Sequence, residues 1–446
     1  MTEEEFLARV TQLEGENAAI LREIDAEKEG YVDKTLPAPA DSILFQFPQR
    51  NPNDPEVLRT ANQTYNMAWD DLEAELARYK NWTWKRDSFT ITPYAWFWLT
   101  GVWESNETFP GEYPLYVQPR FGDDERSHSY FDMKSMRLGA VVTAPESHAL
   151  PGVQISGVFE IDFEGKYIQD NETDILLRKA YLELKNDEFL FLAGQTWEII
   201  HPLVLPMVNW GGGAFGGNLG YRRPMLRYDR YWKQENGQWT FQAGILSSNT
   251  ANLAGTANGT YEGKMGRVPE FQFRLERSWE TFGFWKNAMV AVGGRYAQKE
   301  FQTLEHQFSA DSWSINLDWL IRFTDKCFLM GQYYYGQVLS ANVGGVMQDI
   351  NPQTLAPIRC AGGWLSLSYD FTPKTHGNIG YSIDDPLNQD LGANMRSFNS
   401  IAFANISYDF TKSLNMGIEY AYYSTGYVDL GVAKSNHITV VLNYKL

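Results

Sequence analysis

Apolar and polar side chains alternate one by one along residues 311–323. The odd positions carry Trp313, Ile315, Leu317, Trp319, Ile321 and Phe323, whereas the even positions are mostly polar. Because successive side chains of a strand point to opposite faces, this segment predicts a strand with one apolar and one polar face. The same alternation, bounded by turn residues, predicts sixteen strands. They lie near residues 89–102, 133–143, 153–163, 175–185, 188–197, 221–232, 238–247, 267–279, 285–297, 311–323, 327–338, 361–371, 376–383, 398–410, 414–424 and 437–446.

The predicted connections alternate in length. Short links at 186–187, 233–237, 324–326, 372–375 and 411–413 take turns with long ones at 103–132, 198–220, 248–266, 339–360 and 425–436. A soluble sandwich would bury the apolar face against a second sheet and has no need of this asymmetry. An outer-membrane barrel has short periplasmic turns and long external loops, with its apolar face toward lipid. The pattern therefore favours an all-β transmembrane barrel of 16 antiparallel strands over residues 89–446.

Three predicted strands end in a similar way, with an aromatic residue, a threonine and a lysine. These ends are residues 322–326, 369–374 and 408–412. In a membrane protein an aromatic side chain marks the edge of the lipid and a lysine lies in the water beyond it. The repeat thus places these three turns at one rim of the barrel.

The N-terminal part of the chain has a different period. Apolar residues recur at alternating steps of four and three, which is the seam of a coiled coil. We therefore predict a coiled-coil oligomerisation segment over residues 1–35, with a simple amphipathic tail as the alternative. Residues 36–88 form a proline-rich linker with a second amphipathic helix at 55–80, which rests at the barrel mouth, extends a stalk or plugs the lumen. The coiled-coil seam is Phe6, Val10, Leu13, Asn17, Ile20 and Ile24.

Composition supports an exported membrane barrel. The 446 residues include 15 Trp, 25 Tyr and 26 Phe, and Trp and Tyr are favoured at membrane interfaces. The longest apolar stretch, 201–208, is broken by two prolines and is too short for a transmembrane helix. The acidic start of the chain does not resemble a signal peptide, so we expect a mature form with an added first Met. A net charge of −17 argues against a nucleic-acid partner.

The two cysteines are predicted to be free. Cys327 and Cys360 fall at opposite ends of neighbouring predicted strands, roughly 30 Å apart at about 3.3 Å per residue. No disulfide bridges that distance.

The polar faces of the strands carry both signs of charge. Arginines facing carboxylates across a pore would create a transverse field that favours carboxylate-bearing solutes. Alternatively, the same residues form salt bridges that keep a wide barrel from collapsing. The predicted pore-lining residues are Arg137, Glu160, Asp162, Arg223, Arg227, Asp229, Glu270, Arg274, Glu276, Arg295 and Asp318.

The connection at 198–220, the third on the external side, is the predicted constriction loop. It is apolar at first and then glycine-rich, and its candidate constriction residues are Trp210, Gly211, Gly212, Gly213 and Phe215. A phosphate-binding loop is not expected, because no Gly-Lys-Ser/Thr follows and no helix is predicted to open there. The strands at 175–185 and 188–197 are apolar on both faces, which suits a subunit contact or an infolded loop, and we assign them to a trimer interface.

No enzymatic activity, metal site or cofactor is predicted. The histidines His128, His148, His201, His306, His376 and His437 are scattered, and no two are expected to lie close enough to suggest metal ligation. A hydrolase would need a Ser, His and acid set at one rim. His201, in the predicted constriction loop, has the strongest claim, yet a plain surface histidine is the simpler interpretation.

Several segments resemble the DcaP-like trimeric porins of Gram-negative outer membranes. The likeness rests on the N-terminal coiled coil, the opening strand 91–99 and the Met-Arg-Leu-Gly run at 136–139. It rests most on Leu-Arg-Lys-Ala-Tyr at 177–181 followed by Gly-Gln-Thr-Trp at 194–197. The resemblance implies a sixteen-stranded trimer that passes small solutes, including dicarboxylates, and the related phosphate-selective porins share the fold.

Together these features predict a homotrimeric porin of the bacterial outer membrane, with periplasmic N-terminal helices. It would let small hydrophilic solutes, preferentially anionic ones of carboxylate type, diffuse passively. The alternative is a structural anchor, whose plugged or non-selective barrel holds a stalk that spaces the outer membrane from the cell wall. Expected partners are two further copies, outer-membrane lipid and lipopolysaccharide, small-molecule solutes and peptidoglycan.

Overall fold

The computed structural model describes residues 84–86, 89–110, 113–119, 127–145, 149–165, 173–248, 268–283, 285–302 and 307–446. The described residues belong to one compact unit, which runs from Pro55 to Leu446. The predicted coiled coil at 1–35 and the predicted helix at 55–80 lie outside the described residues, and so does most of the connection at 248–266.

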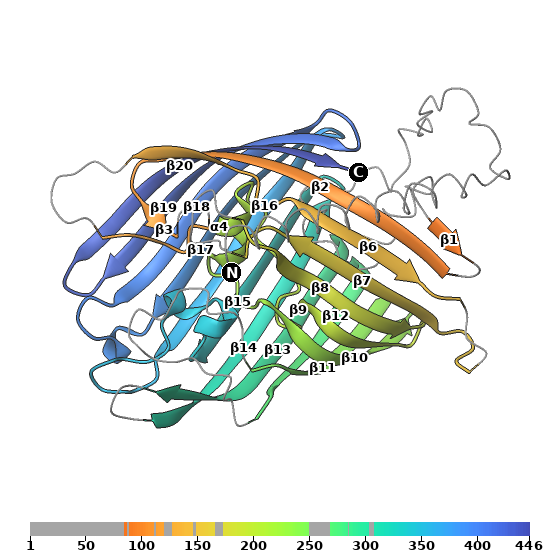
Figure 1. Cartoon of the computed structure of the whole chain (residues 1–446), viewed down its shortest axis with the longest axis horizontal. Helices are drawn as coiled ribbons and strands as arrows, with labels where there is room; N and C mark the ends of the chain where they lie inside the picture. Colours follow the sequence, from red (N-terminus) through yellow and green to blue (C-terminus); the bar gives the residue numbers. More distant parts are fainter. Residues whose placement is uncertain are drawn as a thin grey trace, which may run out of the picture. The chain divides into compact units, whose positions relative to one another are not determined.

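The strands close into one antiparallel barrel (Figure 1). The first barrel strand, β2 (Phe89–Glu104), pairs with the second, which is split into β5 (His128–Asp132) and β6 (Arg137–Thr143). It also pairs with the last, β20 (Gly431–Lys445), so Trp96 lies between Arg137 and Lys445. The strands between them are β7 (Gln154–Asp162), β8 (Leu176–Lys185), β9 (Phe189–Trp197), β10 (Arg222–Gln234), β11 (Gly237–Leu246), β12 (Glu270–Phe282), β13 (Trp285–Gln302), β14 (Gln307–Thr324), β15 (Cys327–Gln337), β16 (Arg359–Thr372), β17 (Thr375–Pro386), β18 (Arg396–Asp409) and β19 (Leu414–Tyr427).

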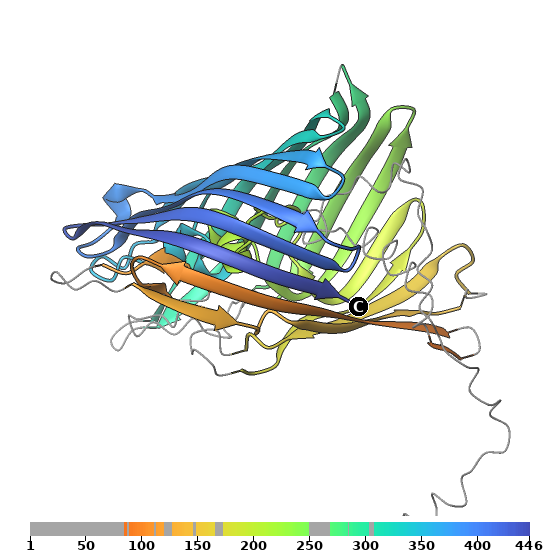
Figure 2. The same ribbon diagram turned by 90° about the horizontal axis from the view of Figure 1, so that it is seen from above.

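This arrangement confirms the prediction of sixteen antiparallel barrel strands. Along β14, Ile315 on the outside is 60% exposed, whereas the next residue, Asn316, is 1% exposed on the inside. The two-residue alternation read from the sequence is therefore the alternation between the outer and inner faces of a closed wall. Figure 2 shows from above that the neighbouring strands of the wall are tilted together.

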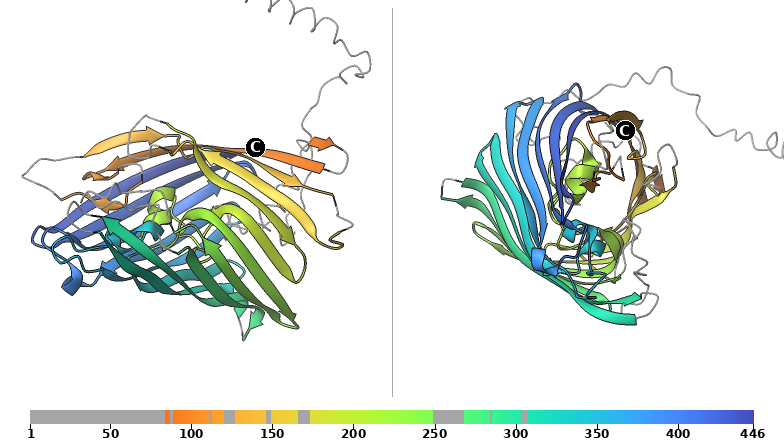
Figure 3. Two further views of the ribbon diagram at one scale, coloured as in Figure 1. Left: turned by 60° about the horizontal axis from the view of Figure 1, so that its bottom comes forward. Right: turned by 90° about the vertical axis from the view of Figure 1, so that its left-hand side faces the viewer.

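Smaller elements lie in the connections. They are β1 (Trp84–Arg86), β3 (Thr108–Phe109), β4 (Tyr116–Val117), the helix α4 (Trp210–Phe215) and the 3-10 turns η3 (Ser340–Asn342), η4 (Gly345–Met347) and η5 (Asn388–Asp390). Figure 3, right, shows α4 inside the ring of strands. Within the described ranges, none of the helices has both the length and the apolar character needed to cross a membrane.

One predicted connection is wrong. The sequence suggested a long loop at 425–436, but β19 continues to Tyr427 and β20 begins at Gly431. These strand ends were missed because their outward positions include Lys434, so the apolar face that marks the other strands is interrupted there. Gly431 has a positive φ of 81°, which lets the backbone turn tightly between the two strands.

Both cysteines are free, as predicted. Cys327 pairs with Tyr369 at one end of the β15–β16 ladder, and Cys360 pairs with Gly336 at the other end. The two thiols are therefore separated by almost the full length of the paired strands.

Candidate functional site

The eleven predicted pore-lining residues lie on the inner side of the wall. All are buried except Arg227 and Glu276, which are partly exposed. Most of them come from adjacent strands between β10 and β14, where inward side chains of opposite sign stand side by side. Whether they contact a passing solute stays a prediction.

The predicted pore-lining arginines on β10, β12 and β13 are paired with carboxylates. Arg223 contacts Glu198 through Nε at 2.6 Å and Glu270 through Nη1 at 3.0 Å. Arg274 donates to a carboxylate oxygen of Asp318 at 3.0 Å and of Glu276 at 2.6 Å. Buried charges of this kind are retained when each has a partner of opposite sign. This part of the wall is therefore a set of internal salt bridges.

The other two predicted pore-lining arginines of this wall, Arg227 and Arg295, also lie beside carboxylates. Arg227 donates to both carboxylate oxygens of Asp229, at 2.8 and 2.6 Å. Arg295 approaches Glu270 at 3.6 Å and donates to the Ser312 hydroxyl at 2.9 Å. The salt-bridge interpretation thus describes this wall better than an open row of guanidinium groups.

Arg137, on β6, has different surroundings. Its guanidinium carbon lies 5.1 Å from the ring centroid of Trp96, 5.4 Å from that of Trp98 and 5.2 Å from that of Trp210. Its Nε and Nη2 are buried and have no hydrogen-bond partner among the described residues. The indoles hold the cation by their π faces while leaving its N–H donors unused.

Three further cations surround this arginine. Arg178 also lies over Trp210 and is paired with Glu160 at 2.8 Å and Asp162 at 2.5 Å. Lys179 approaches Glu160 at 3.8 Å. Arg222 lies over Trp197 and Tyr221, and its Nε and Nη1 have no hydrogen-bond partner in the described part of the chain. Four cations therefore face two carboxylates, which leaves a formal excess of two positive charges. We call Arg137, Arg178, Lys179 and Arg222 the basic cluster.

The connection between β9 and β10, residues 198–221, crosses to the opposite wall, and we call it the constriction loop. On β19, Glu419 accepts hydrogen bonds from the backbone N–H groups of Val208 at 2.7 Å and Asn209 at 3.1 Å. On β18, Asn405 donates from Nδ2 to the Pro206 carbonyl at 2.9 Å and to Glu419 at 2.9 Å. Three of these bonds hold the middle of the loop at the far side of the lumen, and the fourth links Asn405 and Glu419 to each other.

The ends of the constriction loop are held at a second wall. On β15, Gln332 donates to the Ile200 carbonyl at 2.8 Å and accepts from the Leu219 N–H at 3.0 Å. Asn342, in the next infolded connection, donates to Glu198 at 2.8 Å. Because the loop is anchored at both walls, it crosses the lumen as an ordered segment.

The structure corrects the expectation that no helix opens in this loop. Asn209 caps α4 by accepting from the Gly212 N–H at 3.3 Å, which starts a six-residue helix. The glycines of this segment allow neighbouring side chains to pack closely against its backbone. A Cβ on Gly212 would lie 2.3 Å from the Tyr423 hydroxyl, and Gly217 has a positive φ of 63°.

Of the candidate constriction residues, Trp210 packs against the basic cluster, and Gly212 and Gly213 pack against the far wall and the loop itself. Gly211 lies in α4 between them. The side chain of Phe215 lies outside the described residues.

Two other connections also fold inward. In the first, Asn399 donates to the Leu115 carbonyl at 2.9 Å, and Tyr427 donates to the Val117 carbonyl at 2.6 Å. In the second, η3 brings Ala341 close enough for its carbonyl to accept from Arg223 at 3.1 Å. Sequence reasoning missed both, because their anchoring partners are side chains 118 to 310 positions away in the sequence.

Strand β9 is apolar on both faces, as the sequence indicated, whereas β8 turns the buried Arg178 and Glu183 inward, so the prediction of two apolar faces is wrong for β8. Leu190 and Leu192 pack inside with Met225 and Leu246. On the outside, Leu182 and Phe191 are exposed. The inner apolar face is therefore satisfied within the barrel, and the outer one remains available for lipid or another copy.

His201 is not a surface residue, which corrects the simpler interpretation above. It is 4% exposed and its ring stacks on Trp197 at a centroid distance of 4.5 Å. Burial lowers the pKa of His201 to about 4, so the ring is neutral at physiological pH. A neutral, stacked imidazole is a packing element of the constriction loop.

Two other histidines lie closer together than the sequence indicated. His128 and His437 contact the two oxygens of Glu104, at 2.8 and 3.2 Å. Among the residues that the structure describes, however, no group of three or more His, Cys, Asp or Glu side chains is placed to hold a metal ion.

Solved structures with the same fold are outer-membrane proteins. The chain is similar to the outer membrane channel DcaP of Acinetobacter baumannii, with a TM-score of 0.64 and 15% identity over 81% of this chain and 99% of that one. It is also similar to OmpT, an outer membrane protein of Vibrio cholerae, with a TM-score of 0.51 and 14% identity over 82% of this chain and 100% of that one. No protein-family model and no curated protein matches the sequence. At these identities the similarity shows the fold alone.

Proposed function

We propose that the chain is an outer-membrane porin through which small hydrophilic solutes diffuse passively. The observation that carries this proposal is a closed barrel with an apolar outer face, a polar inner face and an ordered loop across the lumen. Such a wall matches lipid outside and water inside, and an infolded loop sets the size of the solutes that pass. The fold shared with the DcaP channel supports the same function.

The proposed channel prefers anions. The basic cluster supports this preference, because among the described residues it has more cations than carboxylates and because Arg137 and Arg222 have N–H donors without a hydrogen-bond partner there, although Arg222 also approaches Asp162 at 3.9 Å. A carboxylate is a natural acceptor for such guanidinium groups. Arg223, Arg227, Arg274 and Arg295 contribute less, since they are paired with acidic side chains.

Planar-bilayer recordings test this function. We expect open-channel steps from the purified protein and, in a salt gradient, a reversal potential that indicates anion preference. Arg137→Met should shift that potential toward cations, because the basic cluster loses one of its two excess charges. The double variant Arg227→Met/Asp229→Asn is the matched control and should leave the potential nearly unchanged, because it removes a pair that carries no net charge.

A cation-selective wild-type channel would refute the proposed anion preference. A barrel without conductance steps would support the second candidate function, an outer-membrane anchor. The observation that favours the anchor is that three connections fold inward, one of which places Trp210 over Arg137.

We further propose that the protein is a trimer whose outer β8–β9 wall meets the neighbouring copies and whose residues 1–35 form a periplasmic coiled coil. Exposed Leu182 and Phe191 support the contact at this wall. Deletion of residues 1–35 is expected to leave folded barrels and to weaken trimers, as measured by light scattering in detergent. Trimers of unchanged stability would show that the coiled coil does not hold the copies together.

A further inference from the structure

The connection between β15 and β16 has a backbone conformation that its residues disfavour. In the described part of the chain, eight residues other than glycine have a positive φ, and three of them are Asn or Asp, which tolerate it. A β-branched or bulky side chain clashes with the backbone there, so residues 338–358, which we call the β15–β16 connection, are under strain. The other five are Val338 (57°), Val343 (64°), Val346 (50°), Met347 (59°) and Leu355 (57°).

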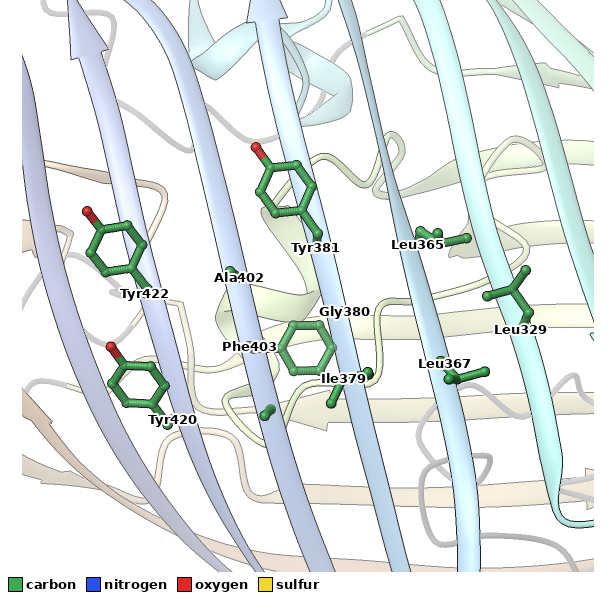
Figure 4. A pocket seen from close by; sticks show the side chains of 11 residues that line it. Leu329, Leu365, Leu367, Ile379, Gly380, Tyr381, Ala402, Phe403, Tyr420 and Tyr422 are labelled. Carbon is green, nitrogen blue, oxygen red and sulfur yellow. The ribbon is translucent and has the colours of Figure 1, made fainter.

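The β15–β16 connection lies inside the barrel, against the other two infolded connections. The Asn342 carbonyl accepts from the Gly220 N–H of the constriction loop at 2.7 Å. Val343 is buried in one apolar cluster with Trp210 of the constriction loop and Leu115 of the connection after β2. The turn η4 lies against β16, β17 and β18. The outer face of that wall carries an apolar groove lined by leucine, isoleucine and tyrosine side chains (Figure 4), so the connection has room to move only within the lumen or toward the nearer mouth of the barrel.

One arginine holds the turn that contains two of the five strained residues. Arg396, at the start of β18, donates from Nε to the Val346 carbonyl at 2.9 Å and from Nη2 to the Met347 carbonyl at 3.4 Å. Its backbone N–H donates to the side-chain oxygen of Gln348 at 2.8 Å, and the Gln348 amide donates to its carbonyl at 2.8 Å. Its guanidinium carbon also lies 4.1 Å from the ring centroid of Tyr116, on β4. Arg396 therefore ties the strained turn and β4 to the same strand.

A buried thiol lies under the same turn. Cys360, near the start of β16, is 1% exposed. A Cβ on Gly345 would lie 3.9 Å from the Cys360 Cβ, so the turn packs directly over this residue. Leu339 of the β15–β16 connection and Leu219 of the constriction loop belong to the same apolar cluster as Cys360. Withdrawal of the β15–β16 connection would therefore uncover one side of the thiol.

We propose that the β15–β16 connection is a strained gate, which Arg396 holds inside the lumen and which relaxes toward the mouth of the barrel when it is released. The released backbone returns to ordinary φ values, so relief of strain favours the open state. The hydrogen bonds of Arg396 favour the closed state, and the balance between the two sets the population of each. This inference concerns the regulation of the channel and rests on the proposed porin function.

Labelling of Cys360 by a water-soluble maleimide tests the role of Arg396. The complete chain is labelled in detergent, and peptide mass spectrometry compares Cys360 with Cys327, the half-buried thiol at the other end of the same strand pair. Arg396→Met loses two hydrogen bonds from a charged donor, so we expect labelling of Cys360 at least about tenfold faster than in wild-type protein. Lys434→Met removes an exposed positive charge at the same end of the barrel and should leave the rate unchanged.

Substitutions at Met347 test the strain itself, with Arg396 in place. Asparagine adopts a positive φ more readily than methionine, so Met347→Asn should stabilise the closed state and slow the labelling of Cys360 roughly fivefold. Met347→Val should speed it, because a β-branched side chain fits this conformation worse. Met347→Leu is the control and should label at the wild-type rate. Heat-modified mobility in detergent gels shows that each barrel is folded.

Planar-bilayer recordings measure the same balance as current. We expect a second, larger conductance level that Arg396→Met occupies at least about tenfold more often than wild-type protein, and Met347→Asn less often.

Two results of the labelling would overturn the gate. One is an equal rate for Cys360 in wild-type protein and Arg396→Met. The other is faster labelling in both Met347→Asn and Met347→Val, which would show that packing of the methionine, and not backbone strain, sets the balance. Because labelling needs no current, a barrel without conductance whose thiol follows the expected order would refute the porin function and confirm the movement. A barrel that conducts while its labelling is the same in every variant would refute the gate alone.

Discussion

Replacing Glu419 with alanine is expected to release the constriction loop and raise the single-channel conductance to that of a wider pore. The variant leaves the N–H groups of Val208 and Asn209 without their acceptor and removes one partner of Asn405. Hydrogen bonds to a charged group contribute about 1.5–3 kcal/mol each. Losing two of them shifts the balance between held and released loop by at least about 100-fold. Planar-bilayer recordings measure the change.

Glu419→Gln is the matched control for this variant. The amide oxygen of the substituted side chain still accepts from the loop backbone, so the conductance should stay near the wild-type value. If both variants raised the conductance equally, the charge of Glu419 would control the current, and its hydrogen bonds to the loop would not. If neither variant differed from wild type, the bonds from Gln332, Asn342 and Asn405 would be enough to hold the loop without Glu419.

Replacing Arg223 with methionine is expected to destabilise the barrel by about 3–5 kcal/mol. This guanidinium is fully buried and contacts Glu198 and Glu270, so its removal leaves two carboxylates with too little compensation. The loss is read from urea unfolding followed by tryptophan fluorescence. Arg227→Met, at a partly exposed pair, should cost much less.

A compensating variant separates charge from packing at this position. When Glu198→Gln and Glu270→Gln are added to Arg223→Met, the uncompensated charges are gone, and we expect a substantial part of the stability to return. Failure of this triple variant to recover would mean that the shape of the arginine, or its hydrogen bonds to the Ala341 and Ser247 carbonyls, holds the wall.

The strand positions were predictable because the signal is local. Ile315 and Asn316 are neighbours in sequence and point to opposite faces, so outer and inner positions follow from the residues themselves. Where the outer face is not apolar, as at Lys434, the signal disappears and the strand end was taken for a loop.

The candidate site was predictable only in part. The alternation along their strands predicted that Arg223 and Arg274 face inward. The position and composition of the connection at 198–220 singled it out, and the structure shows that it crosses the lumen, whereas its role as a constriction stays a prediction. The helix α4 was missed because glycine has a low helix propensity. The reason for glycine at position 212 is visible only in the structure, where the Tyr423 hydroxyl leaves no room for a Cβ. The burial of His201 was missed because Trp197 and the other end of the loop, at Leu219 and Gly220, cover it only when the loop is folded.

By itself, the sequence determined the number of strands, their faces, the free cysteines and the segment that crosses the lumen, because each depends on periodicity or spacing within one short stretch. Only the tertiary structure decided which charges cancel. Arg223 and Arg137 look alike in sequence, yet one lies between two carboxylates and the other among three indoles. The physical reason is that closing the barrel brings together residues separated by tens to hundreds of positions, and electrostatic pairing depends on distance in space.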